Sequence, residues 1–375
     1  MSVAVRWRTG LARLSLMGLA LMASLLLAEG IVRVVAPQPL SGSWRVATPS
    51  GLLVNKSSGT ARHQGGGRTV RYRFHEPHVR DTPWVPSARR ILLLGDSFAF
   101  GWLLHKEETM AWHLQQHADA AVGKGQLHFL NAAAGGWGTA HCLAFLQEIG
   151  DRIQPHAVVV ILNTDDIGRS IRSGLYARKD GDPPHLIRQA VGRSRKKELL
   201  NEWPGYQYLL EHSHLLQLVR RYEVARRPSG RSGGRTSAPS ADPSVPDIPI
   251  PSSQDMDVAG TEAQRWGRAL FREIQRWCAE RNVALYVATT GRHGAMPSTR
   301  NEEPTHAFMR QASAIFAETG IPFQDISPDF LAIPEPDRAA HSIPGDGHPS
   351  PLGSRFIAER IWTTLLKDRL LADGI

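Results

Sequence analysis

Two short segments of this chain carry residue types that together could perform nucleophilic chemistry. A Gly-Asp-Ser segment ending at Ser97 follows the apolar run 91–94, and an Asp-Gly-His segment ending at His348 comes much later in the chain. A free serine hydroxyl is a weak nucleophile at neutral pH and needs a base. His348 would take the hydroxyl proton, and Asp346 would hold the imidazole in the required tautomer. The order Ser, Asp, His therefore predicts a hydrolase that uses Ser97, Asp346 and His348.

Each segment alone has a simpler interpretation. Ser97 could cap the helix that follows it, and the Gly-Asp-Gly sequence before His348 is typical of a surface turn. The surrounding elements favour the catalytic interpretation. Strand patterns alternate with helix patterns, which predicts an α/β domain with a parallel sheet covered on both faces. The predicted strands are 90–94, 126–131, 156–163, 283–290 and 321–326, and the predicted helices are 109–122, 139–153, 261–281, 305–319 and 354–371.

Active sites of such sheets lie beyond the carboxyl ends of the strands, where Ser97, Gly136 and Asp165 each follow a predicted strand. We expect a hydrolase domain at 89–375. It is preceded by an extended, partly strand-like lead-in at 37–88.

Residues 167–260 interrupt the alternation and are interpreted as an insertion into the hydrolase domain. Helical pieces are expected around 198–222. Residues from about 228 to 255 are rich in Ser, Pro and Gly, with few large apolar side chains, which predicts a disordered linker.

The amino terminus has the pattern of a targeting segment. Arg6, Arg8 and Arg13 precede an uncharged stretch at 14–28. A helix over 14–36 would be roughly 34 Å long, enough to span a bilayer. We interpret residues 1–36 as an uncleaved membrane anchor with the catalytic domain outside the cytoplasm, in the periplasm or its equivalent. A cleaved signal peptide is the alternative.

Charge and cysteine usage limit the partners and cofactors. The net charge is +9, with basic clusters at 193–197 and 220–227. These would contact anionic lipid, glycan or nucleic acid, or form a solvated surface near a membrane, which we favour. No nucleic-acid-binding motif accompanies them, and no metal-ligand spacing or cofactor motif is present. Cys142 and Cys278 are either two buried thiols or one disulfide.

Four segments resemble the sequence blocks of the SGNH, or GDSL, hydrolases. They are 91–101 (ILLLGDSFAFG), 129–139 (FLNAAAGGWGT), 158–167 (VVVILNTDDI) and 346–353 (DGHPSPLG). The resemblance covers about 80–167 and 260–371. It implies a three-layer α/β/α sandwich with a five-stranded parallel sheet (flavodoxin-like), with Gly136 as the oxyanion glycine. The anchor and the lead-in also look like membrane-tethered members linked to surface polysaccharides.

The third block departs from the family pattern, because Asp165 stands where the family usually has an oxyanion-binding asparagine. An ionised carboxylate would repel an oxyanion, and losing one donor costs about 2.7–4 kcal/mol. Asp165 could be protonated, Asn163 could turn inward, or the backbone N–H groups of Ser97 and Gly136 could suffice. The acid also lies two residues before His348 rather than the more usual three.

Two classes of function follow. The first is an extracytoplasmic esterase that removes an O-acyl group from a glycan or small ester through an acyl-enzyme on Ser97; with another acceptor the same site would be an acyltransferase. The second is a catalytically impaired binding or assembly protein of surface-polysaccharide machinery, which Asp165 favours. No cofactor, metal or nucleic acid is expected as a partner.

Overall fold

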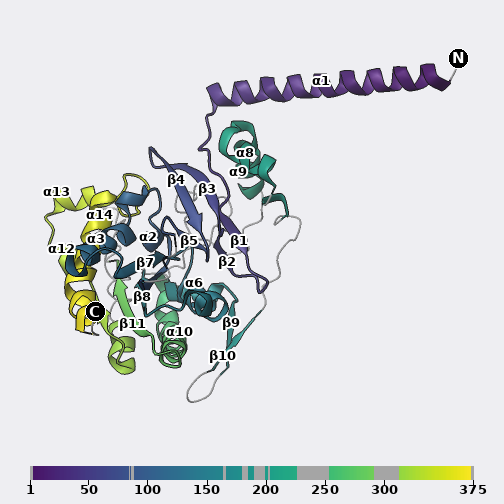
Figure 1. The fold of residues 1–375 in the computed structure, drawn as a ribbon. Helices are drawn as coiled ribbons and strands as arrows, with labels where there is room; N and C mark the ends of the chain where they lie inside the picture. The colour runs from purple at the N-terminus through teal and green to yellow at the C-terminus, as the bar shows by residue number, and fades with distance from the viewer. Residues whose placement is uncertain are drawn as a thin grey trace.

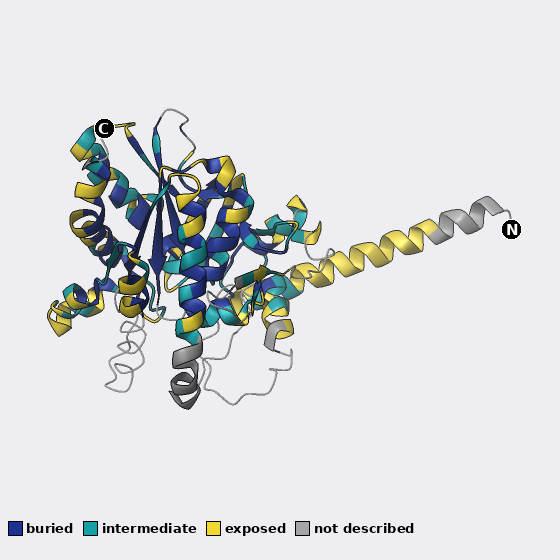
Figure 2. Cartoon of the chain, turned by 90° about the horizontal axis from the view of Figure 1, so that it is seen from below, coloured by how far each residue is buried: buried dark blue, intermediate teal, exposed yellow. Residues whose placement is uncertain are grey.

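The computed structural model describes residues 3–83, 85, 88–163, 166–179, 185–189, 199–201, 203–225, 253–290 and 312–372. Its most isolated element is the helix α1 (Val3–Val35), which projects from the body of the molecule (Figures 1 and 2). The part from Leu11 to Val35 contains an apolar window of mean hydropathy 1.9, and none of that window is buried. A helix this long and apolar can cross a membrane, and a signal sequence has the same properties.

The centre of the domain is a parallel sheet of five strands in the order β12-β11-β8-β6-β7. These are the five predicted strands, so the expected three-layer α/β/α arrangement with a parallel sheet is confirmed. Their bounds are β6 (Arg89–Gly95), β7 (Leu127–Asn131), β8 (Ala157–Leu162), β11 (Ala284–Thr289) and β12 (Phe323–Gln324). The last strand is shorter than predicted.

The lead-in extends this sheet with three antiparallel strands on the β7 edge, giving eight strands in all. They are β3 (Gly59–Gly65), β4 (Arg68–His75) and β5 (Val79–Arg80), and Arg80 pairs with Asn131 of β7. A separate ribbon joins β1 (Arg45–Ala47) to β2 (Leu53–Asn55). The segment before residue 89 therefore belongs to the same sheet as β6, the strand that leads to Ser97.

Two hydrophobic cores lie on opposite faces of the sheet. Along β6, Leu92 and Leu94 face one core while Ile91 and Leu93 face the other. Burial on both faces explains why this strand is a continuous apolar run. The first core packs against α4 (Thr139–Phe145) and α10 (Ser253–Ala279), and the second against α3 (Met110–Val122) and α14 (Pro351–Ile361).

Helical turns complete the two layers. The predicted helix 139–153 continues from α4 through a π-helical turn, Leu146–Gly150, into α5 (Asp151–Ile153). The final helix similarly runs from α14 through Trp362–Leu366 into α15 (Lys367–Ala372). Residues 312–319 are helical as predicted, and 305–311 lie outside the described residues. Shorter elements are α2 (Ser97–Phe100), α12 (Ser327–Leu331), α13 (Glu335–Arg338) and the 3₁₀ turns Lys106–Glu108 and Ala339–His341.

The predicted insertion contains described helices and one β-hairpin. They are α6 (Asp166–Arg172), the hairpin of β9 (Tyr176–Lys179) with β10 (His185–Arg188), and the predicted helical pieces α8 (Pro204–His212) and α9 (His214–Ala225). Most of the predicted disordered linker, 228–252, lies outside the described residues. Residues 253–255 are helical instead, because α10 begins at Ser253 and not at residue 261. Gly260 suggested a boundary, but a helix interior tolerates one glycine at a cost of about 1 kcal/mol.

Candidate active site

Ser97 begins α2 directly after β6, and its two neighbours explain this sharp turn. Gly95 has a φ of 154°, and a Cβ there would lie 2.7 Å from the Ile161 carbonyl oxygen of β8. Only glycine fits such a close approach of two strands. Asp96 caps α2, because its Oδ1 accepts a hydrogen bond from the Phe98 N–H at 2.9 Å. The turn places Ser97 at the carboxyl edge of the sheet.

His348 lies in the loop before α14 and meets Ser97 at this edge. Its Nε2 is 2.8 Å from the Ser97 Oγ, and its Nδ1 is hydrogen-bonded to the Asp346 carboxylate. An ionised carboxylate only accepts, so Nδ1 carries the proton and Nε2 accepts from the serine hydroxyl. This is the geometry of a Ser-His-Asp triad.

The environment of Asp346 favours its ionised form. Burial by itself would raise the pKa of this carboxyl, but the hydrogen bonds from the His348 imidazole and backbone N–H hold the pKa below its ordinary value of 3.8. The side chains of Asp346 and His348 are 18% and 21% exposed. The Asp346 carboxylate is therefore ionised, as it must be to accept the Nδ1–H of His348, and both side chains are partly open to solvent.

An aromatic ring and a buried arginine support the histidine side of the triad. The Trp102 ring stacks on the His348 imidazole with centroids 5.6 Å apart. The loop that carries Trp102 is held by Arg80, which is 1% exposed and donates to the carbonyls of Phe100 (2.7 Å) and Leu104 (2.5 Å). Arg80 belongs to the lead-in strand β5, so that segment positions the site directly.

A polar network behind Ser97 was not anticipated from the sequence. The Asp96 carboxylate is wholly buried, and its Oδ2 accepts from Asn163 Nδ2 and from Arg169 Nη1, each at 2.9 Å. The same Arg169 nitrogen donates to the Trp137 carbonyl at 2.9 Å. Three loops at the strand ends are thereby tied together. From the sequence, Arg169 could be assigned to this network only by its position on one face of α6. That position depends on where α6 begins, which the sequence does not show.

The Gly136 loop lies beside the nucleophile. Gly136 has a φ of 73°, and a Cβ on its neighbour Gly135 would be 3.9 Å from the Ser97 Cβ. Within the described part of the chain, the N–H groups of Ser97 and Gly136 donate to no other residue. They are the groups expected to bind an oxyanion. Asn163 lies at the same edge with its amide on Asp96, and Asp165 lies outside the described residues.

Two other residues near the Gly136 loop have structural explanations. Trp137 is buried and its Nε1 donates to the Leu53 carbonyl at 2.7 Å. The His141 Nδ1 accepts from the Gly138 N–H at 3.1 Å, and burial together with nearby Arg45 and Arg169 lowers the pKa of His141 to about 3. The hydrogen bonds found for these two side chains are to residues outside the triad.

Cys142 and Cys278 are both free and buried. Burial raises the pKa of the Cys278 thiol to about 12, and it raises that of Cys142 as well. They behave as small apolar residues of the core.

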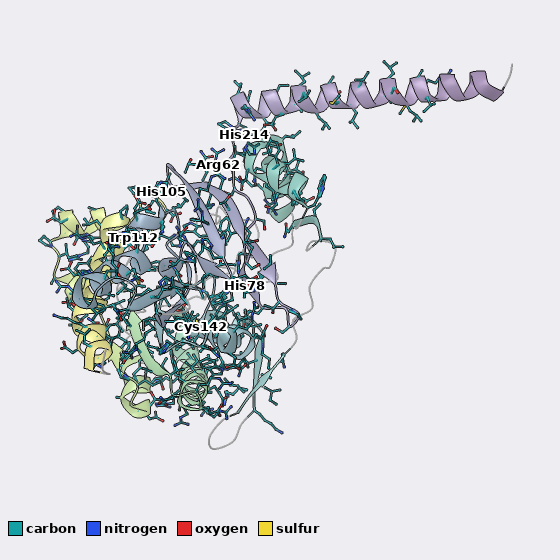
Figure 3. The ribbon with its side chains drawn as sticks, viewed as in Figure 1. Arg62, His78, His105, Trp112, Cys142 and His214 are labelled. Atoms are coloured by element: carbon teal, nitrogen blue, oxygen red, sulfur yellow. The ribbon has the colours of Figure 1, made fainter. Side chains whose placement is uncertain are left out.

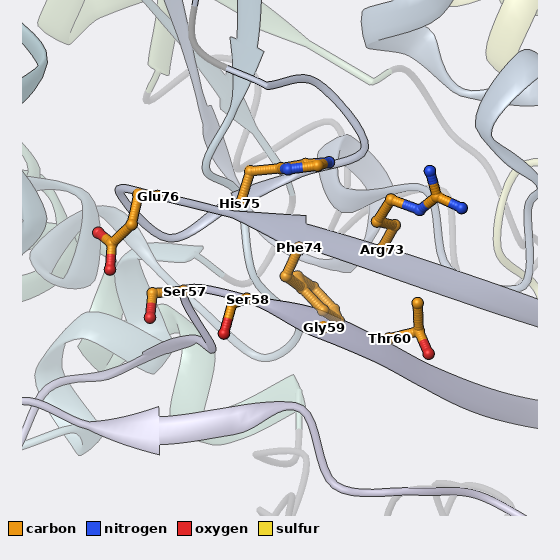
Figure 4. A pocket seen from close by; sticks show the side chains of 8 residues that line it. All are labelled: Ser57, Ser58, Gly59, Thr60, Arg73, Phe74, His75 and Glu76. Carbon is orange, nitrogen blue, oxygen red and sulfur yellow. The ribbon is translucent and has the colours of Figure 1, made fainter.

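A shallow pocket lies on the β3–β4 ribbon (Figure 4), and none of its lining residues belongs to the triad. The lining residues are Ser57, Ser58, Gly59, Thr60, Arg73, Phe74, His75 and Glu76. Among the described residues, no group of three or more His, Cys, Asp or Glu side chains is arranged to hold a metal ion.

No family model matches this chain, and no curated protein sequence matches it. Solved structures similar to it include TesA (16% identity, TM-score 0.38, covering 74% of this chain and 97% of that one). Another is the esterase EstA from Pseudoalteromonas sp. (12% identity, TM-score 0.38, covering 76% of this chain and 99% of that one). A third is the acetylxylan esterase Axe2 from Geobacillus stearothermophilus (12% identity, TM-score 0.40, covering 74% of this chain and 94% of that one). Identities and TM-scores this low carry no weight for the activity of this chain.

Proposed function

We propose that this protein is a membrane-tethered serine esterase of the SGNH type. The observation that carries the proposal is the contact of Ser97 Oγ with His348 Nε2 at 2.8 Å while Nδ1 is held by Asp346. A hydroxyl, a base and an acid that fixes the base are the three parts that acyl transfer to serine needs.

The reaction has two halves with the same groups. Ser97 Oγ attacks the ester carbonyl while His348 takes its proton, and the N–H groups of Ser97 and Gly136 bind the resulting oxyanion. Collapse breaks the carbonyl–alkoxide bond, and His348 returns the proton to the departing alcohol. Water then attacks the acyl-enzyme with His348 again as base, which releases the acid and restores Ser97. An alcohol acceptor in place of water would make the reaction an acyl transfer.

The location and substrate belong to the proposal as well. Arg6, Arg8 and Arg13 lie in the first turns of α1, ahead of its uncharged apolar stretch, which favours an anchor with the domain outside the cytoplasm. Together with the resemblance of the sequence to polysaccharide-associated members of the family, this supports an O-acylated glycan as the substrate and the envelope polysaccharide machinery as a partner.

The test is turnover of an aryl acetate by the detergent-solubilised full chain. We expect turnover that is lost in Ser97→Ala. The matched control is Ser173→Ala, on the loop after α6 and outside the triad, which should keep the rate of the natural chain. Turnover that is absent, or equal in Ser97→Ala, would show that catalysis does not use this serine.

Asp165 favours one alternative, a member of the fold that binds acylated glycan without hydrolysing it. An ionised carboxylate at the oxyanion would oppose the reaction. Asp165→Asn distinguishes the two cases. A gain in aryl acetate turnover of about 10²-fold or more supports the impaired-binding alternative. A reduced rate supports the esterase with a working role for Asp165, and an unchanged rate supports the esterase without such a role.

A further inference from the structure

Exposed apolar side chains outside α1 are concentrated on one part of the molecule. Ten large hydrophobic side chains of the described residues outside α1 are exposed, and eight of them lie between residues 199 and 222. Six of these are at the start of α8 or on α8 and α9: Trp203, Tyr208, Leu209, Leu218, Val219 and Tyr222. Single exposed apolar residues are ordinary, but such a concentration marks an interaction surface.

The two helices are fixed to the domain through their other sides. Leu210 is fully buried, and the Gln217 Nε2 donates to the carbonyls of Ser41 (2.8 Å) and Leu210 (2.6 Å). The Glu211 Oε1 accepts from the Arg62 N–H of β3 at 2.8 Å. Because these contacts hold α8 and α9 against the lead-in, the exposed side chains are left on the outside of the domain.

The end of α1 is hydrogen-bonded to the turn between α8 and α9. The Glu29 carboxylate accepts from the N–H groups of His214 (3.0 Å) and Leu215 (2.9 Å) and from the Ser213 hydroxyl (2.8 Å). It therefore caps the first turn of α9. One turn further along α1, Arg33 donates to the carbonyl of His212, the last residue of α8, at 3.0 Å. Figure 3 shows His214 directly beside this end of α1.

This junction lies at a definite depth if α1 crosses a bilayer. The candidate span begins at Leu11, and Glu29 is the first charged residue after Arg13. The part ahead of Glu29, Leu11–Ala28, is about 27 Å long, against roughly 30 Å for a hydrocarbon core. This span is shorter than the 14–36 expected from the sequence, because it leaves Glu29 and Arg33 outside the hydrocarbon. Glu29 would then leave the hydrocarbon and lie among the lipid headgroups, together with the α8–α9 turn that it caps. Trp and Tyr side chains are favoured at this depth because their rings are apolar and their N–H or O–H groups reach water.

We propose that α8 and α9 form a second membrane contact, an interfacial helical hairpin whose exposed aromatic and aliphatic side chains enter the headgroup region of the phospholipid bilayer that α1 crosses. Amphipathic helices bind membranes in this way, with the apolar face at the acyl boundary and the polar face toward water. This inference rests on the proposed anchor. It adds that the hydrolase domain is held at the membrane surface in one orientation and does not reorient freely about a flexible connection to α1.

The test places a fluorophore on Val219→Cys in the full chain reconstituted into vesicles of phosphatidylcholine and phosphatidylglycerol. The matched control is Leu352→Cys on α14, since Leu352 and Val219 are 49% and 46% exposed. Both natural cysteines are buried, so labelling of the folded chain is directed to the new thiol. Vesicles that carry a bromine- or nitroxide-labelled lipid near the headgroup then act as quencher.

We expect quenching at Val219→Cys to be at least about twofold greater than at Leu352→Cys. Flotation of the same vesicles after an alkaline wash reports the anchor separately. If the chain floats and both labels are quenched equally, the interfacial hairpin is wrong while the anchor stands. If the chain does not float, the anchor fails and the hairpin inference fails with it.

Discussion

The buried carboxylate of Asp96, the residue before the nucleophile, is bound by Arg169 Nη1 at 2.9 Å. Asp96 is fully buried and Arg169 is 19% exposed. Burying an ionised carboxylate without a cation lowers the stability of the fold, so Arg169 is needed to compensate the charge of Asp96. It fixes the turn that presents Ser97 relative to the loop that presents Gly136.

Arg169→Leu should therefore destabilise the fold strongly. Removing one partner of a buried ion pair costs about 3–5 kcal/mol. The control is Arg152→Leu, which removes an arginine paired with Glu76 at 60% and 58% exposure, where the loss should stay below about 1 kcal/mol. The measurement is chemical denaturation of the detergent-solubilised full chain. An equal decrease in the free energy of unfolding in the two variants would mean that the Asp96–Arg169 pair contributes no more to stability than an exposed pair does.

Gly95→Ala should lower the stability of the fold more than Gly123→Ala does. A Cβ at residue 95 would lie 2.7 Å from the Ile161 carbonyl oxygen and 2.9 Å from the Ala99 Cβ. Overpacking of this kind costs about 1–3 kcal/mol in addition to the backbone strain. Gly123→Ala is the matched control, because Gly123 has a φ of 92° with open space around it. A midpoint of unfolding shifted equally in both variants would contradict the tight approach of β6 and β8.

Asp346→Asn should impair catalysis with little effect on substrate binding. An amide can donate to Nδ1 and so favours the wrong tautomer of His348. In a serine protease the corresponding change lowers kcat by about 10⁴. We expect a loss of about 10³–10⁴ in kcat for an aryl acetate with KM nearly unchanged. A loss confined to KM would indicate that Asp346 binds substrate and does not orient the imidazole.

Stability should depend on Asp346 in a defined pH range. The pKa of this carboxyl is lower in the folded chain than its ordinary value of 3.8, because hydrogen bonds from His348 outweigh the effect of burial. Its ionisation therefore stabilises the fold above pH 3.8, and this contribution is lost as the pH falls below that value. The stability difference between the natural chain and Asp346→Asn should shrink over this acidic range. A difference that is constant with pH would contradict the shift.

Much of the fold follows from local patterns. The continuous apolar runs that became β6 and β8 were predicted because both faces of a central parallel strand are buried. The lead-in was predicted to be partly strand-like, but the bounds of β4 were not, although Val70, Tyr72 and Phe74 alternate with arginines in the period of a strand with one buried face. The alternating arginines keep β4 from forming a continuous apolar run, which is the pattern that marks the central strands.

The site residues could be predicted only where a short sequence motif contains the reactive side chain. Ser97, His348 and Asp346 follow from residue type and chain order. The contacts of Asp96 with Asn163 and Arg169 depend on how three loops meet in space, and no local pattern encodes that meeting. Arg80 is similar, because its hydrogen bonds to Phe100 and Leu104 form only once β5 has joined the sheet.

The most direct test of the account is covalent labelling of the full chain with a fluorophosphonate ester. Attack by Ser97 Oγ would displace fluoride while His348 takes the hydroxyl proton. We predict one phosphonyl adduct by intact mass, located on Ser97 by peptide mapping and lost in His348→Ala. An adduct on another residue, or none on the folded natural chain, would contradict the claim that Ser97 is an activated nucleophile.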